Sequence, residues 1–446
     1  MTTKSLQDKI NAAPSVQEML RNAPIGFYKF PVPDLHTNWL DEQRAWVETA
    51  VMFDQSFHMT DLFLSGPDNI RFLSEISINN FKKFGPMKAM QQVICSDDGY
   101  IIGDAISFHM ADGKIHVVGK PSAANYILYA ASKTNLNVEV EKDVRVLEGD
   151  WQRKCYRFQV QGPNALKIME KVNGGPLPEM RFFGMCEFKI LRRKAYGLRH
   201  GMAQAPGIEF WGPFEERHEV REAIIEAGED FGMKLGGGRV YSTAGPQSGW
   251  VGALLPAVYT GAGEADYRKW LPADSYEGTL SQGGSFISDN LEDYYMDPWD
   301  VGYHRLIDWD HEFKGREALV AKRDAGKHRK KIWLRWSVED VEKVTGSLLR
   351  PGPKYKYLEM PAAHYSSCPQ DQVLIDGEPA GVAIYTAYTV AAGAWFSIGI
   401  IDEDKVDLGK EATLIWGEPN GGTRKPTVEP HEQTEVRATM LKTALG

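Results

Sequence analysis

Glu209 is the acidic residue with the least ordinary surroundings in this sequence. It lies within the apolar and aromatic run Ile208-Glu209-Phe210-Trp211, where an unpaired carboxylate would be costly. The side chain therefore needs a partner, and a structural role would pair it with an arginine such as Arg199 or Arg239. A carboxylate can also hold two adjacent N–H donors of a ligand. Both interpretations stay open on the local sequence.

The residues after Glu209 predict a helix from Phe214 to Phe231, with Gly232 at its end. Apolar residues recur at spacings of three and four, which is the pattern of a helix that packs one face inward: Val220, Ala223, Ile224, Ala227 and Phe231. A chain that crosses such a helix returns near its start. We therefore expect Glu209 and the Gly-rich turn 236–241 to face a common cleft, which is the candidate site.

Composition narrows the class of protein. A chain of 446 residues with 43% hydrophobic and 25% charged residues is globular and long enough for two or three domains. Its net charge of -9 argues against nucleic acid, which needs a basic face. The polar N-terminus and the lack of a long apolar run predict a cytoplasmic protein without a membrane span. The four separated cysteines indicate neither a zinc site nor disulfides, so no metal is expected.

The order of elements predicts an α+β fold. Residues 1–330 mix helices with strands joined by hairpins, for example at Asp112-Gly113, which is too hairpin-rich for a doubly wound fold. Within this region, residues 260–297 are rich in Gly, Asp, Ser and Tyr and predict a long surface insertion. Residues 331–446 read as short strands with turns, such as Asp376-Gly377, and predict a separate C-terminal β-barrel domain.

Several motifs, in order, resemble the tetrahydrofolate-dependent aminomethyltransferase family. Arg199-x-Gly201, Gly207, Glu209 and Pro213 are similar to its R-x-G-Y-T-G-E-x-G-x-E-x-x-x-P signature. Four further segments also resemble family motifs: Phe53 to Met59 with Gly66-Pro67-Asp68, Gln161-Gly162-Pro163, Gly238-Arg239, and Phe313 to Leu319. The resemblance spans roughly residues 40 to 440 and implies a folate-binding multi-domain core.

The departures from this family favour one reaction. Amine-processing members carry an acid where this chain has Gly103, before Asp104. With the aromatic Tyr28-Lys29-Phe30 segment, the chain is similar to the tetrahydrofolate-dependent O-demethylases of vanillate, syringate, 3-O-methylgallate and dicamba. The resemblance implies methyl transfer from such an aryl methyl ether to tetrahydrofolate N5. The alternatives are an aminomethyltransferase, an amine or sulfonium demethylase, or a folate-binding regulator without turnover.

The resemblance also implies roles for single residues. Glu209 and Arg239 would hold the folate, although Arg239 could instead tie the loop of Glu209. Tyr241 and His58 are the candidates for stabilising the phenoxide that demethylation leaves. The substrate-binding candidates are residues of the aryl site: Tyr28, Trp250 and Lys120. Lys120 stands where the vanillate-type enzymes carry an arginine for the substrate carboxylate, and lysine keeps the charge without the bidentate fork.

Overall fold

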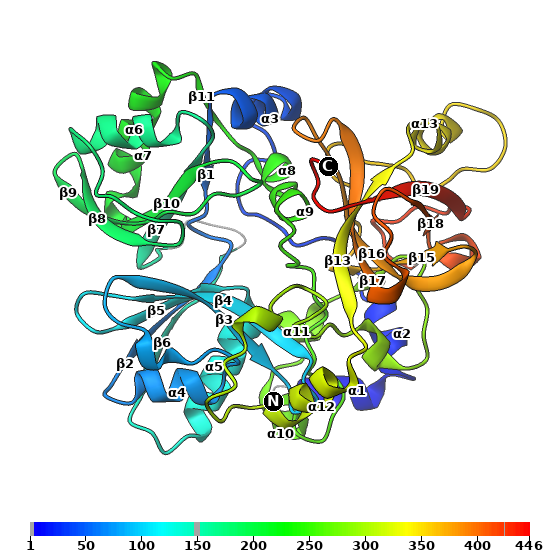
Figure 1. Cartoon of the computed structure of the whole chain (residues 1–446), viewed down its shortest axis with the longest axis horizontal. Helices are drawn as coiled ribbons and strands as arrows, with labels where there is room; N and C mark the ends of the chain where they lie inside the picture. Colours follow the sequence, from blue (N-terminus) through cyan, green and yellow to red (C-terminus); the bar gives the residue numbers. More distant parts are fainter. Residues whose placement is uncertain (1–3, 147–151, 423) are drawn as a thin grey trace.

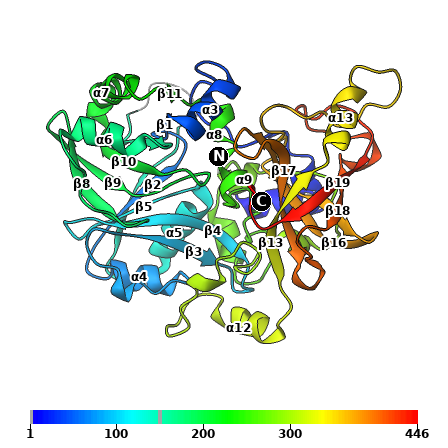
Figure 2. The same ribbon diagram turned by 45° about the horizontal axis from the view of Figure 1, so that its top comes forward.

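The structure, a computed structural model, describes residues 4–146, 152–422 and 424–446. Two sheets and one closed barrel surround a central run that contains the short helices α8 (Gly238–Tyr241) and α9 (Ala244–Ser248). Figures 1 and 2 show this run between the sheets on one side and the barrel on the other. The prediction of an α+β fold with a C-terminal barrel is confirmed.

The first sheet carries Glu209. Its strands follow the order β11-β1-β7-β10-β9-β8, with bounds β1 Ala50–Asp54, β7 Cys155–Gln161, β8 Met185–Ile190, β9 Arg193–Leu198, β10 Gly207–Pro213 and β11 Met233–Leu235. Helices α6 (Ala165–Asn173) and α7 (Arg217–Glu229) pack on it. The helix predicted after Glu209 is confirmed as a short turn, η2 (Phe214–Glu216), followed by α7, which buries Val220, Ile224 and Ala227.

The second sheet lies below the first in Figure 1 and has the order β3-β4-β5-β2-β6. Its strands are β2 Thr60–Ser65, β3 Lys88–Cys95, β4 Ile101–His109, β5 Ile115–Gly119 and β6 Glu139–Asp143. Helix α5 (Pro121–Lys133) packs against β4, and α4 (Asn69–Glu75) follows β2. The predicted turn at Asp112-Gly113 joins β4 to β5, and Gly113 takes the left-handed φ of +85° that suits glycine.

The barrel closes in the order β13-β17-β16-β15-β18-β19. Its strands are β13 Arg329–Trp336, β15 Asp371–Ile375, β16 Glu378–Thr389, β17 Ala394–Asp402, β18 Glu411–Trp416 and β19 Thr434–Leu441, with α13 (Val338–Ser347) beside them. Buried Leu334, Val373 and Trp416 belong to its core. The division into domains of residues 1–330 and 331–446 stays a prediction.

The remaining elements lie before, between and after the strands of the two large sheets and the barrel. Before the first sheet come α1 (Leu6–Ala12), α2 (Val16–Arg21) and α3 (Trp39–Glu48), the last capped by Asn38, whose side chain accepts from the backbone nitrogen of Asp41. The two-residue strands β12 (Gln282–Gly283) and β14 (Cys368–Pro369) pair with each other. The other short elements are η1 Phe81–Lys83, α10 Ala265–Trp270, α11 Tyr276–Thr279, η3 Leu291–Tyr294, η4 His304–Leu306, α12 Arg316–Ala325, η5 Glu403–Lys405 and η6 Pro419–Gly421.

The prediction that residues 260–297 form a surface insertion is wrong. Tyr267, Leu280 and Tyr294 are buried members of the largest apolar core. Glu277 is fully buried and accepts a hydrogen bond from Asn125 Nδ2 at 2.9 Å. The polar composition misled the prediction because the buried polar groups of this segment, such as Glu277, are hydrogen-bonded inside the protein. Among the residues that the structure describes, no helix is long and apolar enough to cross a membrane.

Candidate active site

A cavity of about 370 Å³ lies between the two sheets and the α8–α9 run. It is lined by side chains from β4, β7, β10, α8 and the coil before α3. The cavity brings together most of the predicted site residues, namely Tyr28, His58, Lys120, Glu209, Tyr241 and Trp250. Of residues 236–241, Tyr241 alone lines this cavity together with Glu209, so the expectation of a common cleft holds for Tyr241.

Glu209 lines this cavity and is almost fully buried. Its Oε1 accepts a hydrogen bond from Arg157 Nη1 at 2.6 Å, and its Oε2 lies 3.5 Å from His200 Nδ1. Burial alone would raise the pKa of this carboxyl, but His200 and Arg157 outweigh burial and lower the pKa to about 2. Glu209 is therefore an anion at neutral pH. The arginine partners expected from the sequence, Arg199 and Arg239, are replaced by Arg157.

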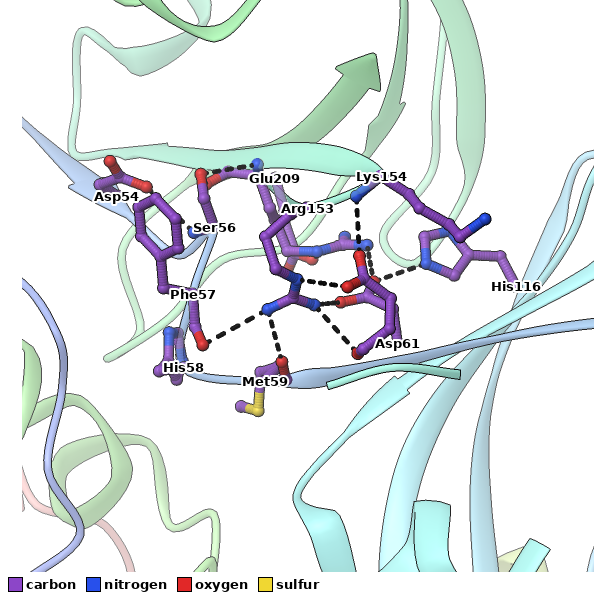
Figure 3. Close-up of polar contacts among 12 residues, drawn as sticks. Asp54, Ser56, Phe57, His58, Met59, Asp61, His116, Arg153, Lys154 and Glu209 are labelled. Carbon is purple, nitrogen blue, oxygen red and sulfur yellow. Dashed lines mark hydrogen bonds and ion pairs between the residues drawn. The ribbon is translucent and has the colours of Figure 1, made fainter. Parts of the chain in front are cut away.

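Arg157 connects Glu209 to a buried group of charges, of which Asp61, Arg153 and His116 are labelled in Figure 3. Its Nη2 lies 3.4 Å from Asp61 Oδ1, and Asp61 Oδ2 accepts from Arg153 Nη2 at 2.5 Å. His116 Nε2 lies 2.6 Å from Asp61 Oδ1. Each of these side chains is buried. The motif-based reading gives no role to Asp61, Arg153 or Arg157, because the contacts join strands far apart in the sequence.

Tyr241 and His58 lie side by side in the cavity. The Tyr241 hydroxyl is 3.3 Å from His58 Nε2 and accepts a hydrogen bond from Gln55 Nε2 at 2.9 Å. Burial raises the pKa of Tyr241 well above its usual range. Burial likewise lowers the pKa of His58 to about 3, and the charge of Arg145 adds to this effect. At neutral pH Tyr241 keeps its proton and His58 is uncharged, so the hydroxyl can donate to the ring nitrogen.

Tyr28, Lys120 and Trp250 form another wall of the cavity. The Tyr28 hydroxyl donates to the backbone oxygen of His58, and Lys120 Nζ donates to the backbone oxygen of Gly252. Lys120 Nζ lies 4.6 Å from the centre of the Tyr28 ring and 5.7 Å from that of Trp250, within the range of cation–π contacts. Burial lowers the pKa of Lys120 to about 8. This wall of the cavity is aromatic and carries the positive charge of Lys120, and the guanidinium of Arg145 also lies over the Tyr28 ring, 3.9 Å from its centre.

The acid on the cavity wall is Asp104, whereas Gly103 points away from it. A Cβ at Gly103 would lie 2.8 Å from the backbone nitrogen of Ala123 in α5. Asp104 Oδ2 accepts hydrogen bonds from Trp250 Nε1 at 2.9 Å and Tyr303 Oη at 2.8 Å, and also from Gln91 Nε2 at 2.7 Å. The acid of the amine-processing pattern is therefore missing at position 103, as the sequence indicates, but the neighbouring Asp104 places another carboxyl group on the cavity wall. Burial raises the pKa of Asp104.

Arg239 does not line the cavity that holds Glu209. It forms an ion pair with Glu359, and both side chains are partly exposed. Arg239 lines a neighbouring cavity of about 780 Å³, which shares Tyr28, Phe30 and Ser242 with the first. Across residues 4–146, 152–422 and 424–446, no group of three or more His, Cys, Asp or Glu side chains could hold a metal ion.

Comparisons with known proteins agree with this architecture. The chain matches the GCVT N-terminal domain over residues 15–244. It is 42% identical to a syringate O-demethylase of Sphingobium sp., over 98% of this chain and 94% of that protein. A sesamin methylene transferase of Sinomonas sp. is 25% identical, over 90% of this chain and 86% of that protein.

The fold is also that of a solved structure. Aminomethyltransferase T of the glycine cleavage system from Bartonella henselae superposes with a TM-score of 0.63 at 14% identity, over 96% of each chain. At this identity the likeness concerns the fold alone. The match to the syringate O-demethylase supports family membership, because it covers 98% of the chain at 42% identity. The chain therefore belongs to the GCVT family, the tetrahydrofolate-dependent, aminomethyltransferase-like transferases that its sequence resembles.

Proposed function

We propose that this protein removes the methyl group of an aromatic methyl ether and transfers it to N5 of tetrahydrofolate, giving a phenol and 5-methyltetrahydrofolate. One observation carries the proposal: a single cavity joins an ionised, buried carboxylate, Glu209, to an aromatic wall with one cation, Lys120. The relative named syringate O-demethylase supports the same reaction class. Syringate, vanillate, 3-O-methylgallate and dicamba are the candidate substrates.

The Glu209 end fits the pterin of tetrahydrofolate. A pterin presents adjacent N–H donors, and a carboxylate that stays ionised is their natural acceptor. Arg157 Nη1 donates to Oε1 of Glu209, while Oε2 faces the more distant His200 ring at 3.5 Å. Met202 and Phe182 give this part of the cavity apolar walls. We assign Glu209 to the cofactor, and we keep Arg239 only as a residue of the neighbouring cavity.

The wall of the cavity formed by Tyr28, Lys120 and Trp250 fits a flat, anionic aromatic ring. Trp250 and Tyr28 offer aromatic faces, and Lys120 offers a positive charge to a substrate carboxylate. A lysine gives one charge without a fixed fork, so it tolerates varied placements of the carboxylate. The proposal needs no partner beyond these two small molecules. It places the reaction in the cytoplasm and gives nucleic acid no part.

Tyr241 is the residue that we assign to the bond-breaking step. The bound tetrahydrofolate supplies the methyl acceptor, and the departing aryl oxygen gains negative charge. Because Tyr241 accepts from Gln55, its own O–H is left to donate, to His58 Nε2 or to a substrate oxygen. Its raised pKa means that it stabilises the oxygen by a hydrogen bond and keeps its proton. Uncharged His58 holds the hydroxyl in place until substrate arrives.

Incubation of the purified protein with tetrahydrofolate and the four candidate methoxybenzoates tests this proposal. We expect equal amounts of the phenol and of 5-methyltetrahydrofolate from at least one ether. An ether that stays intact in every incubation, although tetrahydrofolate binds, would contradict the proposal and favour a folate-binding regulator.

Asp104 is the observation that favours a second candidate, a demethylase or aminomethyltransferase acting on an amine or sulfonium compound. Its carboxylate lies on the cavity wall and could face a cation. Three donors, Gln91, Trp250 and Tyr303, already converge on its Oδ2, which fits an anchor for the wall better than a free base. Turnover of glycine-derived or dimethylsulfonio compounds, with none of the aryl ethers, would establish this alternative.

A further inference from the structure

Asp61, at the start of β2, lies behind the cavity and has both carboxylate oxygens engaged. Oδ2 accepts from Arg153 Nη2 at 2.5 Å, while Oδ1 lies 2.6 Å from His116 Nε2 and 3.4 Å from Arg157 Nη2. Its side chain is 8% exposed. Burial opposes its ionisation, but the hydrogen bond of His116 and the two guanidinium charges hold its pKa well below the usual range. Asp61 is therefore a buried anion between two arginines.

On one side, Asp61 reaches the proposed cofactor end through Arg157. Arg157 holds Asp61 with Nη2 and Glu209 with Nη1. Its backbone is fixed as well, because Arg157 N donates to Ser56 Oγ at 3.1 Å and its carbonyl accepts from Ser56 Oγ at 3.2 Å. A guanidinium held at both ends presents one rigid N–H to Glu209. The position of the Glu209 carboxylate thus depends on Asp61.

On the other side, Asp61 reaches His58 through Arg153, as Figure 3 shows. Arg153 Nη1 donates to the backbone oxygens of Phe57 at 3.4 Å and Met59 at 3.1 Å, the residues on either side of His58. The backbone oxygen of His58 itself accepts from the Tyr28 hydroxyl. Three successive carbonyls are therefore held, which fixes the backbone from which the His58 ring reaches Tyr241.

The signs of charge alternate along this chain of contacts. Glu209, Asp61 and Asp143 are separated by Arg157 and Arg153, and Arg153 Nε lies 3.0 Å from Asp143 Oδ1. Loss of the Asp61 charge would leave two buried guanidinium groups facing each other without the anion between them, which is strongly unfavourable in a buried site. Each arginine would be drawn toward its remaining carboxylate, Arg157 toward Glu209 and Arg153 toward Asp143.

We propose that Asp61 is a positioning residue shared by the two halves of the active site, holding Glu209 through Arg157 and the His58 loop through Arg153. This inference rests on the proposed function, and it adds a division of roles between the two arginines. Arg157 sets the affinity for tetrahydrofolate, Arg153 sets the rate of methyl transfer, and Asp61 sets both.

Three variants test this division: Arg153→Gln, Arg157→Gln and Asp61→Asn. The measurements are the Kd for tetrahydrofolate by calorimetry and the kcat for demethylation. Arg153→Gln should lower kcat about a hundredfold, because a small misplacement of the His58 loop has an effect of that size on the reaction rate. The Kd for tetrahydrofolate should stay within about threefold of the parent value, a change smaller than the loss of a charged hydrogen bond would cause. Arg157→Gln should weaken the Kd roughly ten- to a hundredfold. Asp61→Asn should do both.

A pH profile separates positioning from general damage. Without the Arg157 cation, burial raises the pKa of Glu209, so tetrahydrofolate binding in Arg157→Gln should be lost at a higher pH than in the parent. Arg153→Gln should keep the parent profile. In the double variant Asp61→Asn/Arg153→Gln, kcat should fall no further than in Asp61→Asn alone, because the two changes break one interaction.

His116→Phe is the matched control. It removes a hydrogen bond from the same Asp61 carboxylate while leaving both arginine contacts, and the ring can keep the stacking on Phe63. It should lower the unfolding temperature and leave Kd and kcat unchanged. Losses of Kd and kcat in His116→Phe as large as those in Asp61→Asn would overturn the inference, and so would an Asp61→Asn variant that keeps both.

The outcome also separates this inference from the proposed function. A parent protein that binds no tetrahydrofolate or demethylates no ether refutes the proposed function itself, whereas a working parent with unaffected variants refutes only the role of Asp61. If Asp61→Asn fails to fold, Arg153→Lys and Arg157→Lys decide the question. Each substitution keeps the positive charge and loses the bidentate guanidinium. Arg153→Lys should therefore lower only kcat, and Arg157→Lys should weaken only the Kd for tetrahydrofolate. Equal effects on kcat and Kd in either variant would contradict the separate roles of the two arginines.

Discussion

At the scale of single residues, the two ends of the cavity hold their charges in opposite ways. Glu209 is kept ionised by Arg157 and His200, with a pKa of about 2. Lys120 donates to the backbone oxygen of Gly252, and burial lowers its pKa to about 8. The first group is charged throughout the physiological range. Lys120 loses its proton just above the physiological pH range.

The first prediction concerns Glu209→Gln. It should weaken tetrahydrofolate binding roughly ten- to a hundredfold, because losing a charged partner of a hydrogen bond costs about 1.5–3 kcal/mol. Calorimetric Kd values measure this effect. Glu187→Gln is the control, since Glu187 lies in the same sheet but pairs with Lys194 at the surface. An unchanged Kd for Glu209→Gln would make Glu209 a structural partner of Arg157 and nothing more.

The second prediction concerns Tyr241→Phe, which deletes the hydroxyl and keeps the ring that packs against Phe30 and Phe53. The kcat should fall roughly 10²–10³-fold, the usual effect of removing one hydrogen-bond donor to a developing oxyanion. The fall should be smaller for ethers whose ring substituents already acidify the phenol. Turnover within about threefold of the parent on a poorly activated ether, far less than this effect, would show that Tyr241 only packs.

The third prediction is a pH dependence set by Lys120. Lys120 is protonated below its pKa of about 8 and neutral above it. The KM for an aryl ether that carries a carboxylate should therefore rise as the pH increases through 8, whereas the KM for a methoxyphenol without a carboxylate should not. Lys120→Met should raise the KM of the carboxylate substrate and flatten its pH profile. Parallel profiles for both substrates would show that Lys120 does not face the carboxylate.

The sequence predicts that Glu209 needs a partner, but not which one. Its apolar neighbours reveal the need, whereas Arg157 becomes the partner only because β7 and β10 are adjacent, with Arg157 opposite Trp211. Asp104 is missed for a related reason. The motif counts positions along β4, and the alternation of side chains decides that 104 and not 103 faces the cavity.

At the scale of elements, the close packing of β4 against α5 explains why glycine occupies position 103. A Cβ there would lie 2.8 Å from the backbone of Ala123 and 2.9 Å from Ser122 Oγ. The fourth prediction is that Gly103→Asp, which restores the acid of the amine-processing pattern, destabilises the protein by about 1–3 kcal/mol, as overpacking does, and gives no amine turnover.

Thermal unfolding measures this loss, with Gly85→Asp as the control, because a Cβ at Gly85 meets no atom within 4 Å. Equal unfolding temperatures for the two variants would show that β4 and α5 can move apart at little cost in stability. Amine turnover by Gly103→Asp would mean that position 103 can reach the cavity after all.

Elements with strong local signals are predictable and those fixed by distant partners are not. α7 follows from its apolar spacing, and most barrel strands follow from alternation and turns such as Asp376-Gly377. Residues 260–297 lack such a period, and only the buried pairing of side chains such as Glu277 and Asn125 gives them their place in the core. Long-range pairs of this kind leave no periodic pattern in the sequence.

At the scale of the whole molecule, Asp371 in β15 joins the barrel to the segment of residues 260–297. Its Oδ1 accepts from the backbone nitrogen of Ser285 at 3.0 Å, and burial raises its pKa to about 6. An unfolded aspartate has a pKa of about 3.9. The folded state therefore binds this proton more tightly, and the stability that Asp371 contributes is complete below pH 4 and lost as the pH rises through 6.

The fifth prediction follows from this sign. Asp371→Asn keeps an acceptor for Ser285 and removes the buried charge, so it should be more stable than the parent at pH 7, by up to about 3 kcal/mol for a shift of about two pKa units. Denaturant unfolding at pH 4 and pH 7 measures the difference, which should vanish at pH 4. A variant that is less stable than the parent at both values would show that the carboxylate, and not its proton, holds the barrel in place.

The central claim is that one carbon passes from the aryl oxygen to tetrahydrofolate within a single cavity. The direct test is a single turnover with syringate labelled with carbon-13 in its methoxy groups, followed by NMR. We predict that the label appears as 5-methyltetrahydrofolate in step with the phenol, and that Glu209→Gln slows both signals at subsaturating tetrahydrofolate. Label recovered in methanol or formaldehyde, or phenol formed without tetrahydrofolate, would contradict the account.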